Sequence, residues 1–210
     1  MGTFTGFPPA SQAFYAELEE NNTKEWWSEH QDVYEHAVRE PMAALLDGLS
    51  AEFGPGKVFR PHRDVRFSRD KSPYKTAQGG FVQTAEGTGY YVHLDADGLA
   101  TGAGCHTSSP ARVARLRAAV DAPDEGASLQ SIVESLRAGG YAIEGERLKT
   151  VPRGYEKDHP RAELLRHKSL TAGKTFGAPP WLASADALEH VRAAWTDLRP
   201  LVEWLTDHLG

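Results

Sequence analysis

The dipeptide Asp97-Gly98 is the feature that most limits what this chain can fold into. It lies between two segments of mainly apolar and small residues, Gly89 to Asp95 and Leu99 to Cys105. A two-residue hairpin loop needs backbone torsions that glycine adopts without strain, and Asp-Gly is a strong signal for such a loop. The pattern therefore predicts an antiparallel hairpin near the middle of the chain.

Two further strands are expected before this hairpin. Gly80 to Thr84 is one, and Lys57 to Phe67 is the other, interrupted early at Pro61 because proline has no N–H to give to a sheet. Successive side chains of a strand alternate between its faces, so one face of the longer strand is expected to carry Arg60, His62, Asp64 and Arg66.

Helical periodicity dominates on both sides of this region. Apolar residues recur about every 3.6 positions within residues 10–53 and 184–209, which predicts helices there. Residues 109–176 mix helical segments with short strands. The sequence therefore predicts an α+β fold in which a central antiparallel sheet, over residues 57–106, is flanked by N-terminal and C-terminal helices. A length of 210 residues favours a single domain over residues 1–210.

Composition places the chain among ordinary folded proteins. Hydrophobic residues make up 40% and charged residues 25% of the chain. No apolar run approaches the ~18–20 residues that span a bilayer, and the first residues lack the pattern of a signal peptide. The single cysteine, Cys105, excludes an internal disulfide and favours a reducing compartment. We therefore expect a cytoplasmic protein that does not associate with membranes.

Basic residues are concentrated in two segments of an otherwise acidic chain. The formal net charge is −6, yet 14 of the 23 lysines and arginines lie within residues 57–76 and 147–168. The first segment holds seven basic and two acidic residues (+5), and the second holds seven basic and three acidic residues (+4). The net charge argues against a general nucleic-acid-binding protein, whereas two basic segments that meet in space would attract an anion.

The chemistry of these segments suits an anionic small molecule. Arginine presents a planar fork that matches carboxylate or phosphate oxygens, and lysine supplies a compact charge. We predict a site for a phosphorylated or carboxylated ligand, whose binding residues are Arg60, Arg63, Arg66, Lys71, Lys75, Lys149, Arg153 and Lys168. Candidate polar or acid–base partners beside them are Tyr74, Tyr155 and His159.

Other interpretations of the basic segments stay open. They could form a non-enzymatic face that binds an acidic protein or a nucleic acid. They could also brace the sheet through arginine–aspartate pairs, as Asp64 and Asp70 between their basic neighbours suggest. His159, just before Pro160, is equally typical of a residue at a helix entry. The sequence does not distinguish an enzyme from a binding protein and leaves the oligomeric state undetermined.

Motifs of common cofactor and metal sites are absent from the sequence. The segment Gly102 to Pro110 runs from an expected strand into a helix start, but it lacks the third glycine of a dinucleotide fingerprint. No Gly-Lys-Ser/Thr of a phosphate-binding loop follows it, and the nine histidines include no His-Glu-x-x-His. We therefore expect neither a metal ion nor a cofactor.

The chain resembles a bacterial family of conserved hypothetical proteins, domain of unknown function 2461. The resemblance covers nearly the whole chain, and its main motifs are Asn21 to Trp27, Phe59 to Lys75, Gly89 to Leu94 and Leu148 to Pro160. The basic motif Phe59 to Lys75 is the most specific of them. The family brings no established activity, cofactor or catalytic residue. The resemblance does imply that both basic segments belong to one signature, which favours their convergence in space.

Overall fold

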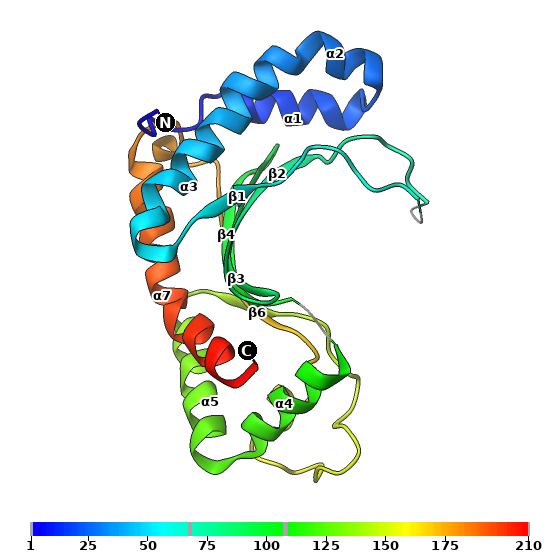
Figure 1. The fold of residues 1–210 in the computed structure, drawn as a ribbon, viewed down its shortest axis with the longest axis vertical. Coiled ribbons are helices and arrows are strands. Elements are labelled where there is room, and N and C mark those ends of the chain that lie inside the picture. The colour runs from blue at the N-terminus through cyan, green and yellow to red at the C-terminus, as the bar shows by residue number, and fades with distance from the viewer. Residues whose placement is uncertain (1, 67–68, 107–108, 210) are drawn as a thin grey trace. The chain divides into compact units, whose positions relative to one another are not determined.

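The computed structural model describes residues 2–66, 69–106 and 109–209. It confirms the predicted α+β class, with an antiparallel sheet, N-terminal helices and a long C-terminal helix (Figure 1). Within these residues the sheet has six strands in the order β1-β2-β3-β4-β6-β5. The strands are β1 Gly56–Val58, β2 Ala77–Ala85, β3 Thr88–Asp95, β4 Gly98–Cys105, β5 Ala142–Glu144 and β6 Leu170–Gly177.

Helices precede and follow the first four strands in the chain. The N-terminal set is α1 Ala10–Glu20, α2 Lys24–Val33, the π-helix η1 Tyr34–Arg39 and α3 Glu40–Phe53. The later set is α4 Pro110–Asp121, α5 Pro123–Ala138, α6 Ala162–Leu165, the 3-10 helix η2 Pro180–Ala183 and α7 Asp186–Leu209. None of the described helices is both long enough and apolar enough to cross a membrane.

The π-helical turn has a local cause in the sequence. Pro41 has no N–H to donate and its ring crowds the preceding turn, so the first turn of a helix is the position where it costs least. The wider turn of η1 ends just before Pro41, which then occupies the first turn of α3. Pro200 is accommodated within α7, which runs unbroken over Asp186–Leu209.

The chain forms two compact units. Unit 1 comprises residues up to Val82, Tyr91–Thr101 and Thr175–Ala193, and unit 2 comprises Gln83–Tyr90, Gly102–Lys174 and the residues from Ala194 onward. Each unit is described by itself below. The domain boundaries expected from the sequence, residues 1–210, stay a prediction.

An aromatic cluster forms one part of the core of unit 1. Its buried members come from α1, α2, η1 and the segment before β2: Phe14, Tyr15, Leu18, Trp27, Tyr34, Val38 and Tyr74. A second part lies where α3 packs against β2. A Cβ added at Gly80 would lie within 3.3 Å of both Leu46 and Met42, so the missing side chain lets the helix approach the strand closely.

In unit 2, aromatic and polar contacts tie helices to strands and to one another. The Tyr90 and Trp195 rings stack with centroids 5.1 Å apart, and the Tyr141 hydroxyl donates to the carboxylate of Asp197 at 2.8 Å. Arg161 closes the end of α4, because its Nε donates to the Val120 carbonyl at 2.6 Å. The guanidinium thereby satisfies a carbonyl that the helix end leaves without a partner.

The expected strand Lys57–Phe67 is wrong in its extent. β1 ends at Val58, and the N–H of Phe59 extends its pairing with β2 by one hydrogen bond, to Gly79 O at 2.9 Å. Pro61 cannot donate, so regular pairing stops there. Phe67, which the prediction included, lies outside the described residues.

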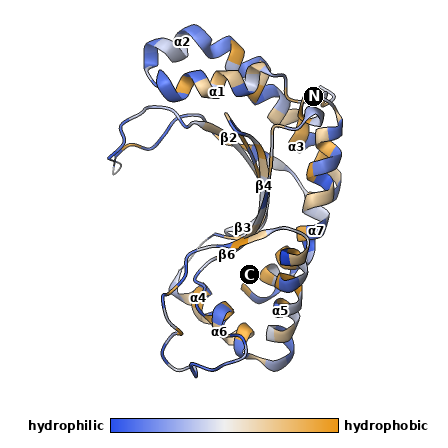
Figure 2. Ribbon diagram, turned by 180° about the vertical axis from the view of Figure 1, so that it is seen from behind, coloured by the Kyte–Doolittle hydropathy of each residue, from blue (hydrophilic) through white to orange (hydrophobic). Residues whose placement is uncertain are grey.

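The described chain beyond β1 forms what we call the basic arm, residues 59–66 and 69–75. Arg63 N donates to Pro73 O at 2.9 Å and Lys75 N donates to Pro61 O at 2.8 Å, with an isolated bridge between His62 and Tyr74. The arm extends beyond the strands in Figure 1, and Figure 2 shows that it is mainly hydrophilic.

The predicted hairpin is present, with its loop one residue earlier than expected. β3 ends at Asp95 and β4 begins at Gly98, so the loop residues are Ala96 and Asp97. One carboxylate oxygen of Asp95 accepts from the N–H groups of Asp97 at 3.0 Å and of Gly98 at 3.1 Å. Gly98 has a φ of 120°, which explains why glycine occupies the position after the loop.

Candidate functional site

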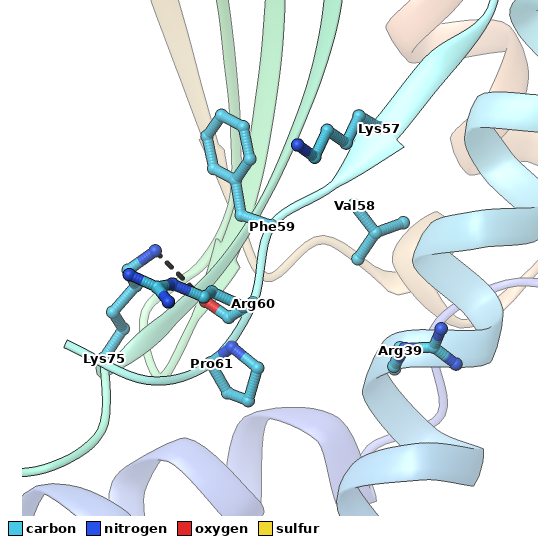
Figure 3. A pocket seen from close by; sticks show the side chains of 7 residues that line it. All are labelled: Arg39, Lys57, Val58, Phe59, Arg60, Pro61 and Lys75. Atoms are coloured by element: carbon cyan, nitrogen blue, oxygen red, sulfur yellow. Dashed lines mark hydrogen bonds between the residues drawn. The ribbon is translucent and has the colours of Figure 1, made fainter. Parts of the chain in front are cut away.

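A pocket of about 570 Å³ lies in unit 1, where the basic arm leaves β1 (Figure 3). Its lining residues are Arg39, Lys57, Val58, Phe59, Arg60, Pro61 and Lys75. Of the eight ligand-binding residues expected from the sequence, Arg60 and Lys75 line it. Lys57 belongs to the same basic segment, whereas Arg39 comes from η1, a helical segment outside both basic segments.

Backbone hydrogen bonds bring the two predicted residues together. The pairing of Lys75 N with Pro61 O holds the two sides of the arm side by side at its base. The Lys75 amine then donates to the carbonyl of Arg60 at 3.1 Å (Figure 3). The same amine lies 5.5 Å from the centroid of the Phe59 ring, a geometry that stabilises a cation.

A chain of buried hydrogen bonds holds the backbone of the pocket at Phe59. The side-chain amide of Gln78, which is 1% exposed, donates to the carbonyl of Phe59 at 2.8 Å. Its oxygen accepts from the Tyr34 hydroxyl at 2.6 Å. A buried amide is costly unless its hydrogen bonds are made, so this pairing holds the backbone of Phe59 in one position.

The electrostatics of the pocket are one-sided. Burial, and secondly the charge of Arg60, lower the pKa of the Lys75 amine. Arg39 pairs with Glu35 one helical turn away. Among the described residues, no ion pair is found for Lys57, Arg60 or Lys75, and no carboxylate lines the pocket. The described lining of the pocket therefore brings Arg60 and Lys75 together without a lining carboxylate, although the charge of Arg60 also acts on Asp64 outside the pocket.

The other predicted residues of the arm are engaged within the arm itself. Arg63 forms an ion pair with Asp70. Arg66 forms a bidentate ion pair with Asp64, in which Nε donates to Oδ1 at 2.9 Å and Nη2 donates to Oδ2 at 2.6 Å. The Lys71 amine donates to a backbone carbonyl, that of Val65, at 2.9 Å. None of the three lines the pocket. These contacts agree with the structural interpretation of the arginines, and exposed pairs of this kind contribute little stability.

The carboxylates in these pairs carry lowered pKa values. Hydrogen bonds from Arg66 lower the pKa of Asp64. Hydrogen bonds from the side chain and backbone of Ser72, and secondly the charge of Arg63, lower the pKa of Asp70. Ser68, which the sequence also places in this segment, lies outside the described residues.

Tyr74 is a core residue at the base of the arm. It is 6% exposed, and its ring stacks on Trp27 with centroids 4.0 Å apart and planes 9° apart. Tyr74 does not line the pocket. Its position supports a role in placing Lys75, the next residue, rather than contact with a ligand.

The predicted residues of the second basic segment belong to unit 2. Lys168 pairs with Glu146, whereas Lys149 and Arg153 are exposed. The pocket belongs to unit 1, and the convergence of the two basic segments therefore stays a prediction.

Two acid–base candidates also lie in unit 2. His159 Nδ1 accepts from the N–H of Arg161 at 3.0 Å, and Nε2 lies 3.3 Å from a carboxylate oxygen of Asp121. These contacts suit a residue at a helix entry, since Ala162 begins α6. Tyr155 is partly buried, and its N–H donates to Pro152 O at 3.4 Å.

The described residues contain no cluster of side chains that could bind a metal ion. No group of three or more histidine, cysteine, aspartate or glutamate residues is arranged there to hold a metal ion. His93 Nε2 lies 3.4 Å from a carboxylate oxygen of Asp95, but this pair has no third partner of that kind.

Comparison with known proteins gives one result. No curated protein and no solved structure matches this chain. The profile of a conserved hypothetical protein family, DUF2461, matches residues 10–204, a range that includes all residues lining the pocket. The chain therefore belongs to the DUF2461 family of conserved hypothetical proteins.

Proposed function

We propose that this protein binds an anionic small molecule, through a carboxylate or phosphate group, in the pocket at the base of the basic arm. The observation that carries the proposal is the placement of Arg60 and Lys75 in one pocket without a lining carboxylate. Like charges at close range destabilise each other; burial, and secondly the charge of Arg60, lower the pKa of Lys75. A bound anion would relieve the repulsion.

The size and rigidity of the pocket support this proposal. Its volume of about 570 Å³ falls within the range of small-molecule sites, roughly 300–1,000 Å³. The amine of Lys75 and the backbone of Phe59 are already held by hydrogen bonds. A ligand that meets groups already in place loses less conformational entropy on binding, which favours affinity.

The lining residues favour binding and charge stabilisation over proton transfer. Among the described residues, those that line the pocket include four cations and no carboxylate, histidine or hydroxyl side chain. A pocket of this composition can orient an anion and stabilise negative charge, and it offers no conventional general base.

Calorimetric titration with ribose 5-phosphate and with citrate tests the proposal. We expect at least one of the two to bind the wild-type protein in 150 mM salt. Arg60→Met and Lys75→Met should each weaken binding about tenfold or more, because each removes a charge from the pocket. Arg69→Met is the matched control, since Arg69 lies in the same arm but does not line the pocket. It should change affinity less than twofold.

Two outcomes would contradict the proposal. One is a wild-type protein that binds neither compound, and the other is an equal loss of affinity in Arg69→Met and Arg60→Met. Binding only to a polyanion such as heparin, with a steep loss between 50 and 500 mM salt, would support a basic interaction face instead. Thermal unfolding of each variant separates lost binding from lost folding.

A further inference from the structure

We propose that the anion bound in this pocket carries an aromatic ring, and that this ring packs against Phe59. The inference rests on the function proposed above and narrows the ligand to one chemical class: flat aromatic compounds with a phosphate or carboxylate, such as nucleoside monophosphates. The juxtaposition of one aromatic side chain with the cations of a single pocket carries the argument.

Phe59 lies beside the cations that would hold the anionic group. It lines the pocket together with Lys57, Arg60 and Lys75, and it is only partly buried (Figure 3). The Lys75 amine is 5.5 Å from the ring centroid, so a charged group and an aromatic surface lie within the span of one small molecule. A ligand that has both an anionic group and a ring would use both.

Two more aromatic rings support Phe59 on the same face of the sheet. We call Phe59, Phe81 and Tyr91 the aromatic row; the Phe59 centroid is 6.4 Å from that of Phe81 and 6.1 Å from that of Tyr91. Phe81 and Tyr91 are partly buried, whereas their neighbours Val82 and Val92 are fully buried. The strands thus bury one face in the core and leave aromatic surface on the other.

Gly79 lets two rings of the row lie close to the sheet. A Cβ added there would lie 2.9 Å from Phe59 Cδ2 and 2.9 Å from both Cε2 and the hydroxyl of Tyr91. Real Cβ atoms do not approach other atoms this closely, so any other residue would displace the rings. The glycine therefore determines where the Phe59 ring lies relative to the pocket.

The backbone that carries the ring is also fixed. Phe59 donates its N–H to Gly79 O at 2.9 Å and accepts from the buried amide of Gln78 at 2.8 Å. A ring on a constrained backbone needs little ordering when a second ring packs against it, which is how aromatic platforms gain affinity for planar ligands. The competing interpretation is that Phe59 only covers the Lys75 side chain.

Titrations with three matched compounds decide between these interpretations. Ribose 5-phosphate carries the anion alone, adenosine carries the ring alone, and adenosine 5′-monophosphate carries both. We expect the wild-type protein to bind the monophosphate about tenfold or more tightly than ribose 5-phosphate, as stacking on one aromatic side chain would allow. Adenosine should bind more weakly than the monophosphate, because it lacks the charge that the cations recognise.

Two variants of Phe59 test the residue itself. Phe59→Leu keeps an apolar side chain but removes the ring, so it should abolish the preference for the monophosphate over ribose 5-phosphate. Phe59→Tyr keeps the ring and should retain the preference. This rescue also shows that a loss in Phe59→Leu comes from the missing ring rather than from general damage to the fold.

The outcomes separate this inference from the function on which it rests. If ribose 5-phosphate and the monophosphate bind equally well and Lys75→Met weakens both, the anion site stands and the aromatic preference is wrong. An unchanged preference in Phe59→Leu would likewise overturn the role of Phe59. If the wild-type protein binds none of the three compounds and does not bind citrate, both proposals fail.

Discussion

The side-chain amide of Asn22 makes two hydrogen bonds to the backbone of Tyr74, a residue 52 positions later in the chain. Its Nδ2 donates to Tyr74 O at 3.0 Å and its Oδ1 accepts from Tyr74 N at 3.1 Å. Asn22 thereby satisfies the N–H and carbonyl of Tyr74 as the backbone of a neighbouring strand would, at the base of the basic arm. Because Lys75 follows Tyr74, this contact helps to hold the Lys75 amine at the pocket.

Removal of the Asn22 amide should destabilise the protein. Asn22→Ala leaves an N–H and a carbonyl of Tyr74 without partners in a partly buried position, at a cost of about 1–3 kcal/mol in the free energy of unfolding. Asn21→Ala is the control, because the side chain of Asn21 makes a single, exposed hydrogen bond, to Glu17 O. Urea unfolding measures both variants. An equal loss in the free energy of unfolding of both variants would show that the hydrogen bonds to Tyr74 do not stabilise the fold more than an exposed one does.

The stacked rings of Trp27 and Tyr74 should be energetically coupled. Aromatic pairs contribute about 0.5–1.5 kcal/mol beyond the area they bury, so a double-mutant cycle with Trp27→Leu and Tyr74→Leu should give a coupling of that size. Urea unfolding of the four proteins provides the cycle. Additive effects, within roughly 0.3 kcal/mol, would contradict the stacking as a stabilising contact.

Acid should destabilise the protein through His167. This residue is 2% exposed, its Nδ1 donates to Ser169 O at 3.0 Å, and burial lowers the pKa of its ring. Below a pH of about 6.5, His167 of the unfolded chain takes up a proton, whereas the buried ring in the folded protein stays neutral. The free energy of unfolding therefore falls as the pH drops from about 6.5 toward the lowered pKa, and above 6.5 His167 causes no loss. His167→Gln should lose less stability than the wild type between pH 7.5 and 5.5. Equal losses would contradict this role.

Anion binding should weaken in alkali through Lys75. Burial and Arg60 lower the pKa of its amine, so the protonated form that attracts an anion is lost at a lower pH than for an exposed lysine. The affinity for ribose 5-phosphate should therefore fall as pH rises between 8 and 10. Lys75→Arg, whose charge persists throughout this range, should show a smaller fall in the same titrations. Parallel pH profiles would count against the placement of Lys75 at the bound anion.

Gly79→Ala should impair the aromatic preference more than the anion site. The added methyl group would displace the rings of Phe59 and Tyr91 and leave the cations of the pocket in place. The ratio of the affinities for adenosine 5′-monophosphate and ribose 5-phosphate should fall about tenfold, with the latter affinity within threefold of the wild type. A retained ratio would show that the position of the rings does not matter to binding.

Local patterns were enough to predict the fold class. Asp97-Gly98 marked the hairpin because loop chemistry is local, and the apolar period of about 3.6 residues located the helical regions. The loop itself lies one residue earlier, because Asp95 accepts from the N–H groups of Asp97 and Gly98 and so begins the turn. The extent of the strand before it was wrong, since β1 ends at Val58 and the pairing beyond Pro61 consists of isolated contacts within the basic arm.

The candidate site could be predicted only in part. Arg60 and Lys75 stood out because they lie in a short basic segment, and the structure places both in one pocket. Arg39 and Gln78 did not, because their contacts join parts of the chain far apart in sequence. Asn22 was noted within a family motif, yet its contact with Tyr74 depends on how the turn between α1 and α2 packs, which no local pattern records.

Lysine side-chain NMR during a titration with ribose 5-phosphate tests the central claim most directly. The amine-adjacent signals of Lys75 and Lys57, assigned with Lys→Arg variants, should shift along one saturable curve, while that of Lys24, an exposed lysine of α2 that does not line the pocket, should stay nearly constant. Such a result would locate the anion at the base of the basic arm. Shifts that are equal for all three lysines, or that never saturate, would contradict a pocket for a small anion.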